Sequence, residues 1–294
     1  MDAVVAAQPR VRRIALPGRG GDTQGLEFGP QDRPIDIVFS HANGFNALTY
    51  RTLLAPLADE GLRILAIDQR GSGLSRLPAV TEGRKSWTGL ADDLLAVLAA
   101  MGVERAVLAG HSMGGTISLF AAAREPARVK ALGLFDPVIM APQMLELAKA
   151  GGLTASPLVQ GALRRRSLFP SRAAALEAYR GRGAFKTWPE AMLADYVEAG
   201  FRDRDDGQVE LSCAPEWEAS NFSTHAHDPW AAFADSRCPI RILKAEEGST
   251  CSAVEGPLTA DGRIRIETVP GTSHFLPMER PDRVQAVLMD LAAL

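Results

Sequence analysis

Strand-like and helix-like segments alternate along most of this chain, and this alternation restricts the possible folds more than any other feature of the sequence. Residues 11–28 have the pattern of a hairpin with a glycine-rich turn. Apolar strand patterns then recur at 35–40, 63–68, 106–110, 129–135, 240–245 and 263–269. Helical patterns fill the intervals, ending at about residue 60 and covering 87–101, 114–124, 229–235 and 280–291. Such alternation is typical of a mainly parallel sheet that is covered by helices.

The alternation stops after Pro137 and resumes near residue 229. The interval contains four helical patterns and one possible strand, at 141–149, 157–166, 172–181, 189–200 and 209–211. Because no strong strand interrupts these helices, we expect the interval to lie outside the main sheet. The sequence therefore predicts an α/β core domain in two segments, 1–137 and 229–294, and a helical insertion at 138–228.

Charge and hydropathy exclude several classes of function. The chain has 32 Lys and Arg residues against 35 Asp and Glu, a formal net charge of −3. It therefore lacks the general basic field that nucleic-acid binding requires. The longest apolar run, at 94–101, is far shorter than the roughly 20 residues that span a bilayer. We expect a protein that acts on a small molecule and has neither a nucleic-acid nor a membrane partner.

The cysteines and the N-terminal residues indicate a cytoplasmic protein. Three cysteines without a CxxC pattern are typical of reduced thiols and not of a disulfide framework or a zinc site; they are Cys213, Cys238 and Cys251. Residues 1–13 lack the basic start and the long apolar stretch of a signal peptide, so no such peptide is expected.

The sharpest chemical signal is a G-x-S-x-G pattern at residues 110–114, between a predicted strand and a predicted helix. A strand that turns sharply into a helix holds the residue at its tip in a strained conformation. Gly110 and Gly114 fit beside that tip because side chains would collide where strand and helix pass closely. Ser112 is therefore expected to project at the carboxyl end of the strand, near the positive end of the helix dipole.

This pattern resembles the nucleophile turn of the α/β-hydrolase family, and the resemblance extends from about Val11 to the last helix. It implies a mostly parallel eight-stranded sheet flanked by helices, with the insertion at 138–228 as a helical cap and Ser112 as the nucleophile. It implies neither a metal nor a cofactor. Residues 41–45 resemble the family's oxyanion loop, and the resemblance assigns the oxyanion donors to the backbone N–H groups of Asn43 and Met113.

The resemblance also implies a histidine on a loop after the last strand. His274 stands at that place and would accept the proton of Ser112, because a hydroxyl alone is a poor nucleophile. The other histidines are less suitable as bases, since they lie inside the nucleophile turn, in the oxyanion loop or in the insertion; they are His111, His41, His225 and His227.

The acid that orients the histidine departs from the commonest family pattern. That pattern has an aspartate after the strand at 241–245, where this chain has Gly248. Some members carry the acid at the end of the strand that follows the nucleophile helix, and this chain has Asp136 there. Asp136 is the preferred acid, because an unpaired carboxylate at the end of an apolar strand would be costly to bury. Glu247 or Glu246 is the alternative.

Three further clusters have competing interpretations. His225 and His227 suggest a metal site, but two ligands without a third argue against one. The run Arg164–Arg166 is expected to form a solvated face and not an anion site. Four aromatic side chains either line an acyl pocket or form the core of the insertion, and both interpretations stay open; they are Trp188, Trp217, Trp230 and Phe222.

The sequence thus predicts a serine hydrolase that cleaves a small carboxylic ester through an acyl-enzyme on Ser112. Epoxide hydrolases and haloalkane dehalogenases of this fold use an aspartate nucleophile, so the serine argues against both. Carbon–carbon bond hydrolases, lactonases and cofactor-free perhydrolases are alternatives, and a ligand-binding relative without enzymatic activity is a weaker one. The fold alone does not choose between them.

Overall fold

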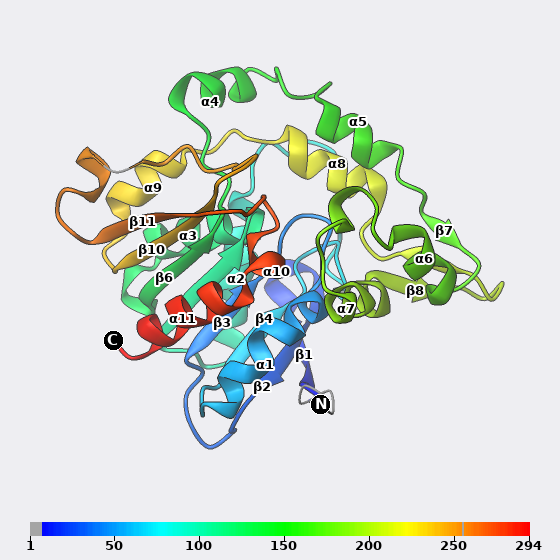
Figure 1. The fold of residues 1–294 in the computed structure, drawn as a ribbon, viewed down its shortest axis with the longest axis horizontal. Helices are drawn as coiled ribbons and strands as arrows, with labels where there is room; N and C mark the ends of the chain where they lie inside the picture. The colour runs from blue at the N-terminus through cyan, green and yellow to red at the C-terminus, as the bar shows by residue number, and fades with distance from the viewer. Residues whose placement is uncertain (1–7, 255) are drawn as a thin grey trace.

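A computed structural model of the protein describes residues 8–254 and 256–294. Its centre is an eight-stranded sheet in the order β1-β2-β4-β3-β5-β6-β10-β11 (Figure 1). The hairpin of β1 and β2 is antiparallel and forms one edge, and every neighbouring pair from β4 to β11 is parallel. The strands are β1 Arg10–Leu16, β2 Gly21–Phe28, β3 Ile37–Ser40, β4 Ile64–Ile67, β5 Ala106–His111, β6 Val129–Phe135, β10 Ile240–Ala245 and β11 Ile264–Val269. The predicted mostly parallel eight-stranded sheet is confirmed.

Helices cover both faces of this sheet and bury two apolar cores. Strand side chains alternate between the faces, as the two-residue period of a strand requires. Val38 and Leu108 belong to the core under α2, α3 and α9, whereas Phe39 and Val107 belong to the core under α1 and α11. The helices of the sheet domain are α1 Arg51–Asp59, α2 Thr88–Ala100, α3 Met113–Arg124, α9 Pro229–Asp235, α10 Leu276–Glu279 and α11 Pro281–Ala292.

Residues 138–228 leave the sheet after β6 and return before β10, which is the neighbour of β6. Figure 1 shows α4, α5 and α8 above one end of the sheet, with α6 and α7 to the side. The helices are α4 Pro142–Lys149, α5 Pro157–Leu163, α6 Arg172–Tyr179, α7 Glu190–Gly200 and α8 Pro215–Ser223. A small antiparallel sheet accompanies them, formed by β7 Leu168–Phe169, β8 Phe201–Asp203 and β9 Val209–Leu211.

The expectation of a purely helical insertion with one possible strand was therefore incomplete. The strand at 209–211 is present, but β7, β8 and helix α8 were missed. The two missed strands have two and three residues, which is too short for a periodic pattern to develop. In the sheet domain, the short helix α10 was missed for the same reason.

The parallel strands end at one edge of the sheet, and the loops there carry the residues singled out from the sequence. Four of these strands end directly before such a loop, at Ser40, His111, Phe135 and Val269. Residues 1–7, the start of the segment examined for a signal peptide, lie outside the described residues. Within the part that the structure describes, no helix has the length and apolar character needed to cross a bilayer.

Candidate active site

Ser112 lies at the tip of the turn from β5 into α3. Its backbone has φ 54° and ψ −122°, a region that costs about 1–3 kcal/mol to occupy. A side chain on Gly110 would begin 2.5 Å from the backbone of Gly114, and one on Gly114 would collide with the carbonyl oxygens of Ser40 and His41. The sharp turn expected from the G-x-S-x-G pattern is present, and both glycines are required by close backbone approach.

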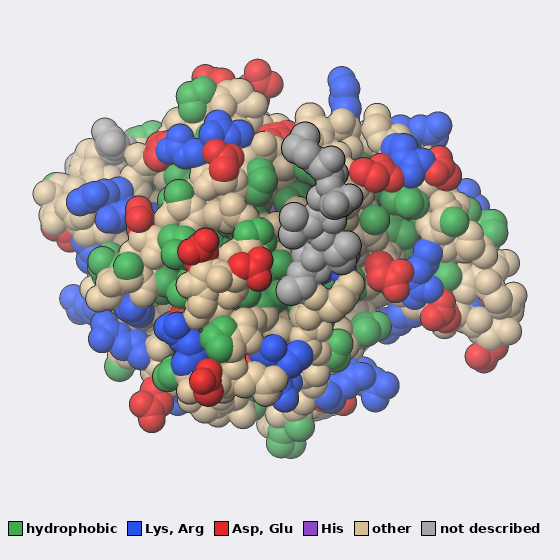
Figure 2. All heavy atoms as spheres, turned by 60° about the horizontal axis from the view of Figure 1, so that its bottom comes forward, with side chains coloured by type: hydrophobic (Ala, Val, Ile, Leu, Met, Phe, Trp, Pro, Cys, Tyr) green, Lys and Arg blue, Asp and Glu red, His purple; other side chains and the backbone are tan. Residues whose placement is uncertain are grey.

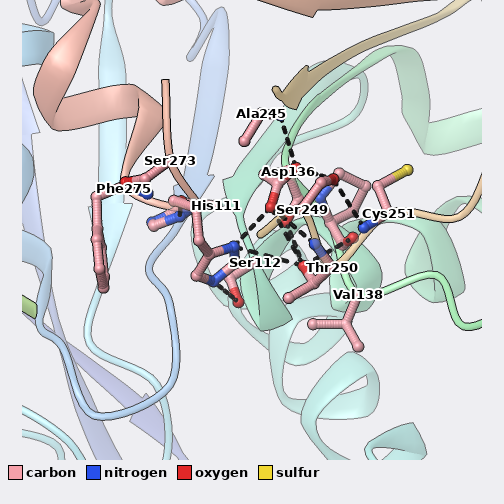
Figure 3. Close-up of polar contacts among 12 residues, drawn as sticks. His111, Ser112, Asp136, Val138, Ala245, Ser249, Thr250, Cys251, Ser273 and Phe275 are labelled. Carbon is pink, nitrogen blue, oxygen red and sulfur yellow. Dashed lines mark hydrogen bonds and ion pairs between the residues drawn. The ribbon is translucent and has the colours of Figure 1, made fainter. Parts of the chain in front are cut away.

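Two hydrogen bonds join three side chains at the edge of the sheet (Figure 3). The Nε2 atom of His274 lies 3.0 Å from Oγ of Ser112. Its Nδ1 atom lies 2.6 Å from Oδ2 of Asp136. Asp136 and Ser112 are almost fully buried, whereas 23% of the His274 side chain is exposed. This is the arrangement in which a histidine accepts a proton from a serine while a carboxylate stabilises the resulting imidazolium.

The carboxylate of Asp136 is held by several donors besides His274. Its Oδ1 atom accepts from the backbone N–H of Ala245 at 2.9 Å and from the hydroxyl of Ser249 at 2.5 Å. Its Oδ2 atom accepts from the backbone N–H of Thr250 at 3.0 Å. Burial raises the pKa of Asp136, but the hydrogen bonds to its carboxylate outweigh burial and leave the pKa below its ordinary value. Asp136 is therefore stabilised as an anion.

The alternative acids lie outside this arrangement. Glu246 and Glu247 are exposed, and the carboxylate of Glu246 accepts from the backbone N–H of Gly271 at 2.8 Å. Neither carboxylate forms a hydrogen bond or ion pair with His274 among the described residues. The structure therefore brings Asp136 to the histidine and not the glutamates.

The loop after β3 lies against the start of α3, because Gly114 packs directly on the backbone of Ser40 and His41. The backbone N–H groups of Asn43 and Met113 have no hydrogen-bond partner in the described parts of the chain, so both are free to bind an oxyanion. The side chain of Asn43 is fixed by α8: its amide donates to the carbonyl of Glu218 at 3.0 Å and its oxygen accepts from Asn221 at 2.7 Å.

The sequence pattern of the alpha/beta hydrolase family matches residues 37–287, which is most of the chain. The chain belongs to the α/β-hydrolase family. The fold and the coarse class, a hydrolase, follow from this membership, whereas the bond that is cleaved does not.

Individual relatives of this α/β-hydrolase differ in chemistry. It is 25% identical to the 2-(acetamidomethylene)succinate hydrolase of Mesorhizobium japonicum over 252 residues, 84% of each protein. A crystal structure of E-2-(acetamidomethylene)succinate hydrolase has the same fold, with a TM-score of 0.76 and 22% identity over 97% of this chain and 100% of that chain. The 2-hydroxymuconate semialdehyde hydrolase of Pseudomonas sp. strain CF600 is 34% identical over 102 residues, 34% of this chain and 35% of that protein.

His111 connects the nucleophile turn of this α/β-hydrolase to the loop of His274. Burial lowers the pKa of His111 to about 3, so its ring is neutral. Its Nε2–H donates to the backbone carbonyl of His274 at 2.8 Å, and its Nδ1 accepts from the hydroxyl of Tyr50 at 2.8 Å. The same hydroxyl accepts from the N–H of Ala42 at 3.2 Å. From the sequence we considered His111 only as a base and missed this contact. The one signal in the sequence that could have indicated it was the position of His111 next to Ser112.

His41 fixes the oxyanion loop from within. It is fully buried, and burial lowers its pKa to about 4, so its ring is also neutral. Its Nδ1–H donates to the carbonyl of Ala42 at 2.7 Å, and its Nε2 accepts from the backbone N–H of Gln69 at 3.0 Å. His41 therefore supports the turn that carries Asn43.

His225 and His227 are core histidines. Burial lowers their pKa values to about 4 and about 3, and both rings pack on Trp87 at centroid distances of 4.9 Å. His225 contacts the carbonyl of Phe222 at 3.1 Å, and His227 accepts from the N–H of Trp87 at 3.3 Å. Across the residues described, no group of three or more His, Cys, Asp or Glu side chains is placed to hold a metal ion.

The run Arg164–Arg166 does not form a uniformly solvated face, so that expectation was wrong for its central residue. Arg164 is exposed. Arg165 is mostly buried, pairs with the carboxylate of Glu218 and donates to the hydroxyl of Tyr196 at 2.7 Å. Burial of the guanidinium explains why this arginine needs an acid partner.

Of the four aromatic side chains, Trp188 lies beside the site. Its ring packs on Phe45 of the oxyanion loop, with 5.1 Å between the ring centroids. It also packs on Phe275, the neighbour of His274, with 5.9 Å between the centroids. The other three pack elsewhere: Trp217 beneath Arg84, Trp230 on Phe233, and Phe222 in a small cluster between α5 and α8.

Proposed function

We propose that the protein is a serine hydrolase that cleaves a small carboxylic ester through an acyl-enzyme on Ser112. The observation that carries the proposal is the continuous path from Ser112 through His274 to Asp136, with distances of 3.0 and 2.6 Å. Both are within the reach that general base catalysis needs.

In the proposed reaction, Oγ of Ser112 attacks the ester carbonyl while His274 takes the hydroxyl proton. Asp136 stabilises the imidazolium that forms. The N–H groups of Asn43 and Met113 donate to the oxyanion, and each such donor is worth roughly 3–4 kcal/mol of barrier. His274 then protonates the leaving alcohol. A water molecule, deprotonated by the same histidine, releases the acid and restores Ser112.

We further propose that residues 138–228 act as a cap over the site. Three contacts support this role: α8 binds the side chain of Asn43, the Tyr196 hydroxyl lies 3.3 Å from the carbonyl of Gly44, and Trp188 packs on Phe275. The insertion therefore touches both the oxyanion loop and the histidine loop. The apolar rings beside the site favour an uncharged acyl or alcohol group.

A second candidate is hydrolysis of an acylated acidic substrate. The name of the M. japonicum relative describes a dicarboxylate that carries an acetamide group. In this chain Arg165 lies against Gly44 of the oxyanion loop. Its Nη1 atom is 3.3 Å from the position that a Cβ atom on Gly44 would occupy. Glu218 neutralises much of this charge, so we rank the candidate second.

The decisive experiment is labelling with a fluorophosphonate probe, with Ser112→Ala as the control. The wild type should label and hydrolyse short neutral p-nitrophenyl esters, and the variant should do neither. A wild type that neither labels nor hydrolyses contradicts the proposal.

A comparison of neutral and acidic esters separates the two candidates. If kcat/KM for p-nitrophenyl hemisuccinate exceeds that for the butyrate ester by tenfold or more, and Arg165→Gln removes the preference, the second candidate replaces the first. A preference for the neutral ester supports the first.

We also propose that the protein acts in the cytoplasm on a small-molecule substrate. The three cysteines are buried and free in the structure, which is compatible with a reducing compartment. Fractionation of cells that express the protein with a C-terminal tag tests this, and recovery in a membrane or secreted fraction contradicts it.

A further inference from the structure

A cavity of about 450 Å³ lies next to α8 and the start of α2. Its wall includes four cationic side chains and one indole ring, those of Arg19, Arg70, Arg84, Lys85 and Trp217. The residues that line it include neither Ser112 nor His274. The cavity is therefore separate from the proposed catalytic residues.

One carboxylate faces this group of cations. Asp93 accepts from Nε of Arg19 at 2.6 Å and from the guanidinium of Arg70 at 2.7 and 2.8 Å. Arg84 and Lys85 have no acid partner among the described residues. Four positive charges against one negative charge leave the cavity with an excess of about three positive charges.

Arg84 is the side chain that most clearly needs a further partner. Its Nη1 donates to the hydroxyl of Ser220 at 2.9 Å, and its guanidinium lies 4.2 Å from the centroid of the Trp217 ring. Its Nη2 is buried and has no hydrogen-bond acceptor within the described part of the chain. Burial, followed by the charge of Arg70, lowers the pKa of Arg84 to about 10. A buried cation without an acid partner is costly, so an anion in the cavity would stabilise the charge of Arg84.

The start of α2 adds a second, independent attraction for anions. Ser86, Gly89 and Leu90 line the cavity, and α2 is a helix of 13 residues. The positive end of its dipole therefore lies beside the same space. In its first turn the N–H groups of Thr88 and Leu90 are bonded to Ser86 and Trp87, so among the described residues Gly89 supplies the one N–H without a partner.

The cationic excess is local. The chain as a whole has a formal charge of −3. On the face shown in Figure 2, Lys and Arg side chains are interspersed with Asp and Glu and do not form one basic patch. The net charge of the chain therefore does not explain the group of cations in the cavity.

We propose that this cavity is a binding site for a small organic molecule that carries a phosphate or carboxylate group. Arg84, Arg70 and Lys85 contribute positive charge, and Trp217 packs against the rest of the molecule. The cavity is larger than a bare oxyanion requires, which leaves room for that organic part.

The test is isothermal titration of the full-length protein with inorganic phosphate and, separately, with succinate, against chloride at matched ionic strength. We expect saturable binding of at least one of the two anions, and the stronger binder identifies the class. Arg84→Gln should weaken that binding about tenfold or more, since it removes a positive charge that has no acid partner among the described residues. Arg283→Gln, at a half-buried arginine on α11 that pairs with Glu267 and does not line the cavity, is the matched control and should bind as the wild type does.

Two results would overturn the proposal: no saturable binding of either anion, or equal affinity in Arg84→Gln and the wild type. Lys85→Gln covers the case in which Arg84→Gln does not fold. The Lys85 side chain is exposed, so its replacement leaves the core intact. We expect it to weaken the binding about threefold or more, and an unchanged affinity in this variant contradicts the proposal as well.

Discussion

Ser112 and Asp136 lie at the ends of neighbouring strands, and both have a backbone conformation that residues other than glycine rarely adopt. Their φ angles are 54° and 42°, and no other non-glycine residue in the described ranges has a positive φ. The N–H of Ser112 donates to the carbonyl of Phe135, directly before Asp136, at 3.0 Å. Both side chains contact the imidazole of His274. Backbone strain of this kind persists only where the surroundings fix it, and here it aims two groups at one ring.

Replacing the acid should cost far more than replacing its alternative. We expect Asp136→Asn to lower ester turnover by up to about 10⁴-fold, because the imidazolium loses its orienting anion. Glu247→Gln should change turnover less than about twofold, since its carboxylate is exposed and does not contact His274. Steady-state kinetics of both variants decide the matter, and the reverse ranking would move the acid to the turn after β10.

The lowered pKa of Asp136 predicts a specific loss of stability in acid. A carboxyl group whose pKa is lower in the folded than in the unfolded protein stabilises the fold fully above its unfolded pKa of about 4. That stabilisation disappears as the pH falls through the lower folded value. The free energy of unfolding in urea should therefore decrease more steeply below pH 4 in the wild type than in Asp136→Asn. Equal slopes in the two proteins would show that Asp136 is not stabilised as an anion.

His111 is predicted to act as a positioning residue for His274. His111→Leu removes the donor to the His274 carbonyl, and we expect kcat to fall about tenfold while KM changes less than twofold. His111→Gln should recover most of the loss, because its amide can donate to the same carbonyl. A KM that rises with no change in kcat, or a lack of recovery by glutamine, would leave His111 with a purely structural role.

Two glycines should respond oppositely to alanine. At Gly114 the new methyl group would lie 2.5 Å from the carbonyl oxygen of His41, and backbone cannot move aside, so Gly114→Ala should cost about 3 kcal/mol or more. Gly161 lies within α5 with open space around the position of a side chain, so Gly161→Ala should stabilise the protein by about 0.5–1 kcal/mol. Thermal and urea unfolding measure both, and a tolerated Gly114→Ala contradicts the close approach of β3 and α3.

The parts of the molecule that could be predicted from sequence are those with strong local patterns. The buried strands carry unbroken apolar runs, so short segments predict the sheet. The glycines at 110 and 114 indicate that β5 and α3 pass closely, which predicts the position of Ser112. The contact of Asp136 with His274 needed two further arguments: the resemblance to the family, which implied both positions, and the cost of an unpaired carboxylate at the end of an apolar strand.

Features that depend on contacts between residues far apart in the chain could not be predicted from the sequence. The carbonyl of His274 is hydrogen-bonded to the ring of His111, which lies 163 residues earlier in the chain. No local pattern near either residue indicates this pair. Arg165 lies in a run of arginines that is typical of a surface, yet Glu218, 53 positions later, draws it inward. The strands β7 and β8 form because they pair with β9 and have no periodic pattern of their own.

All three side chains of the proposed triad come from outside residues 138–228. Ser112 and Asp136 are both present before the chain enters that segment, and only His274 follows it. In the proposed mechanism the reacting side chains and the proposed cap therefore come from different stretches of the polypeptide, and if the cap selects the substrate, a lineage could change substrates by altering one uninterrupted stretch of its gene. The hydrogen bonds between Asn43 and α8 join the two stretches, so every such change would have to keep or replace them.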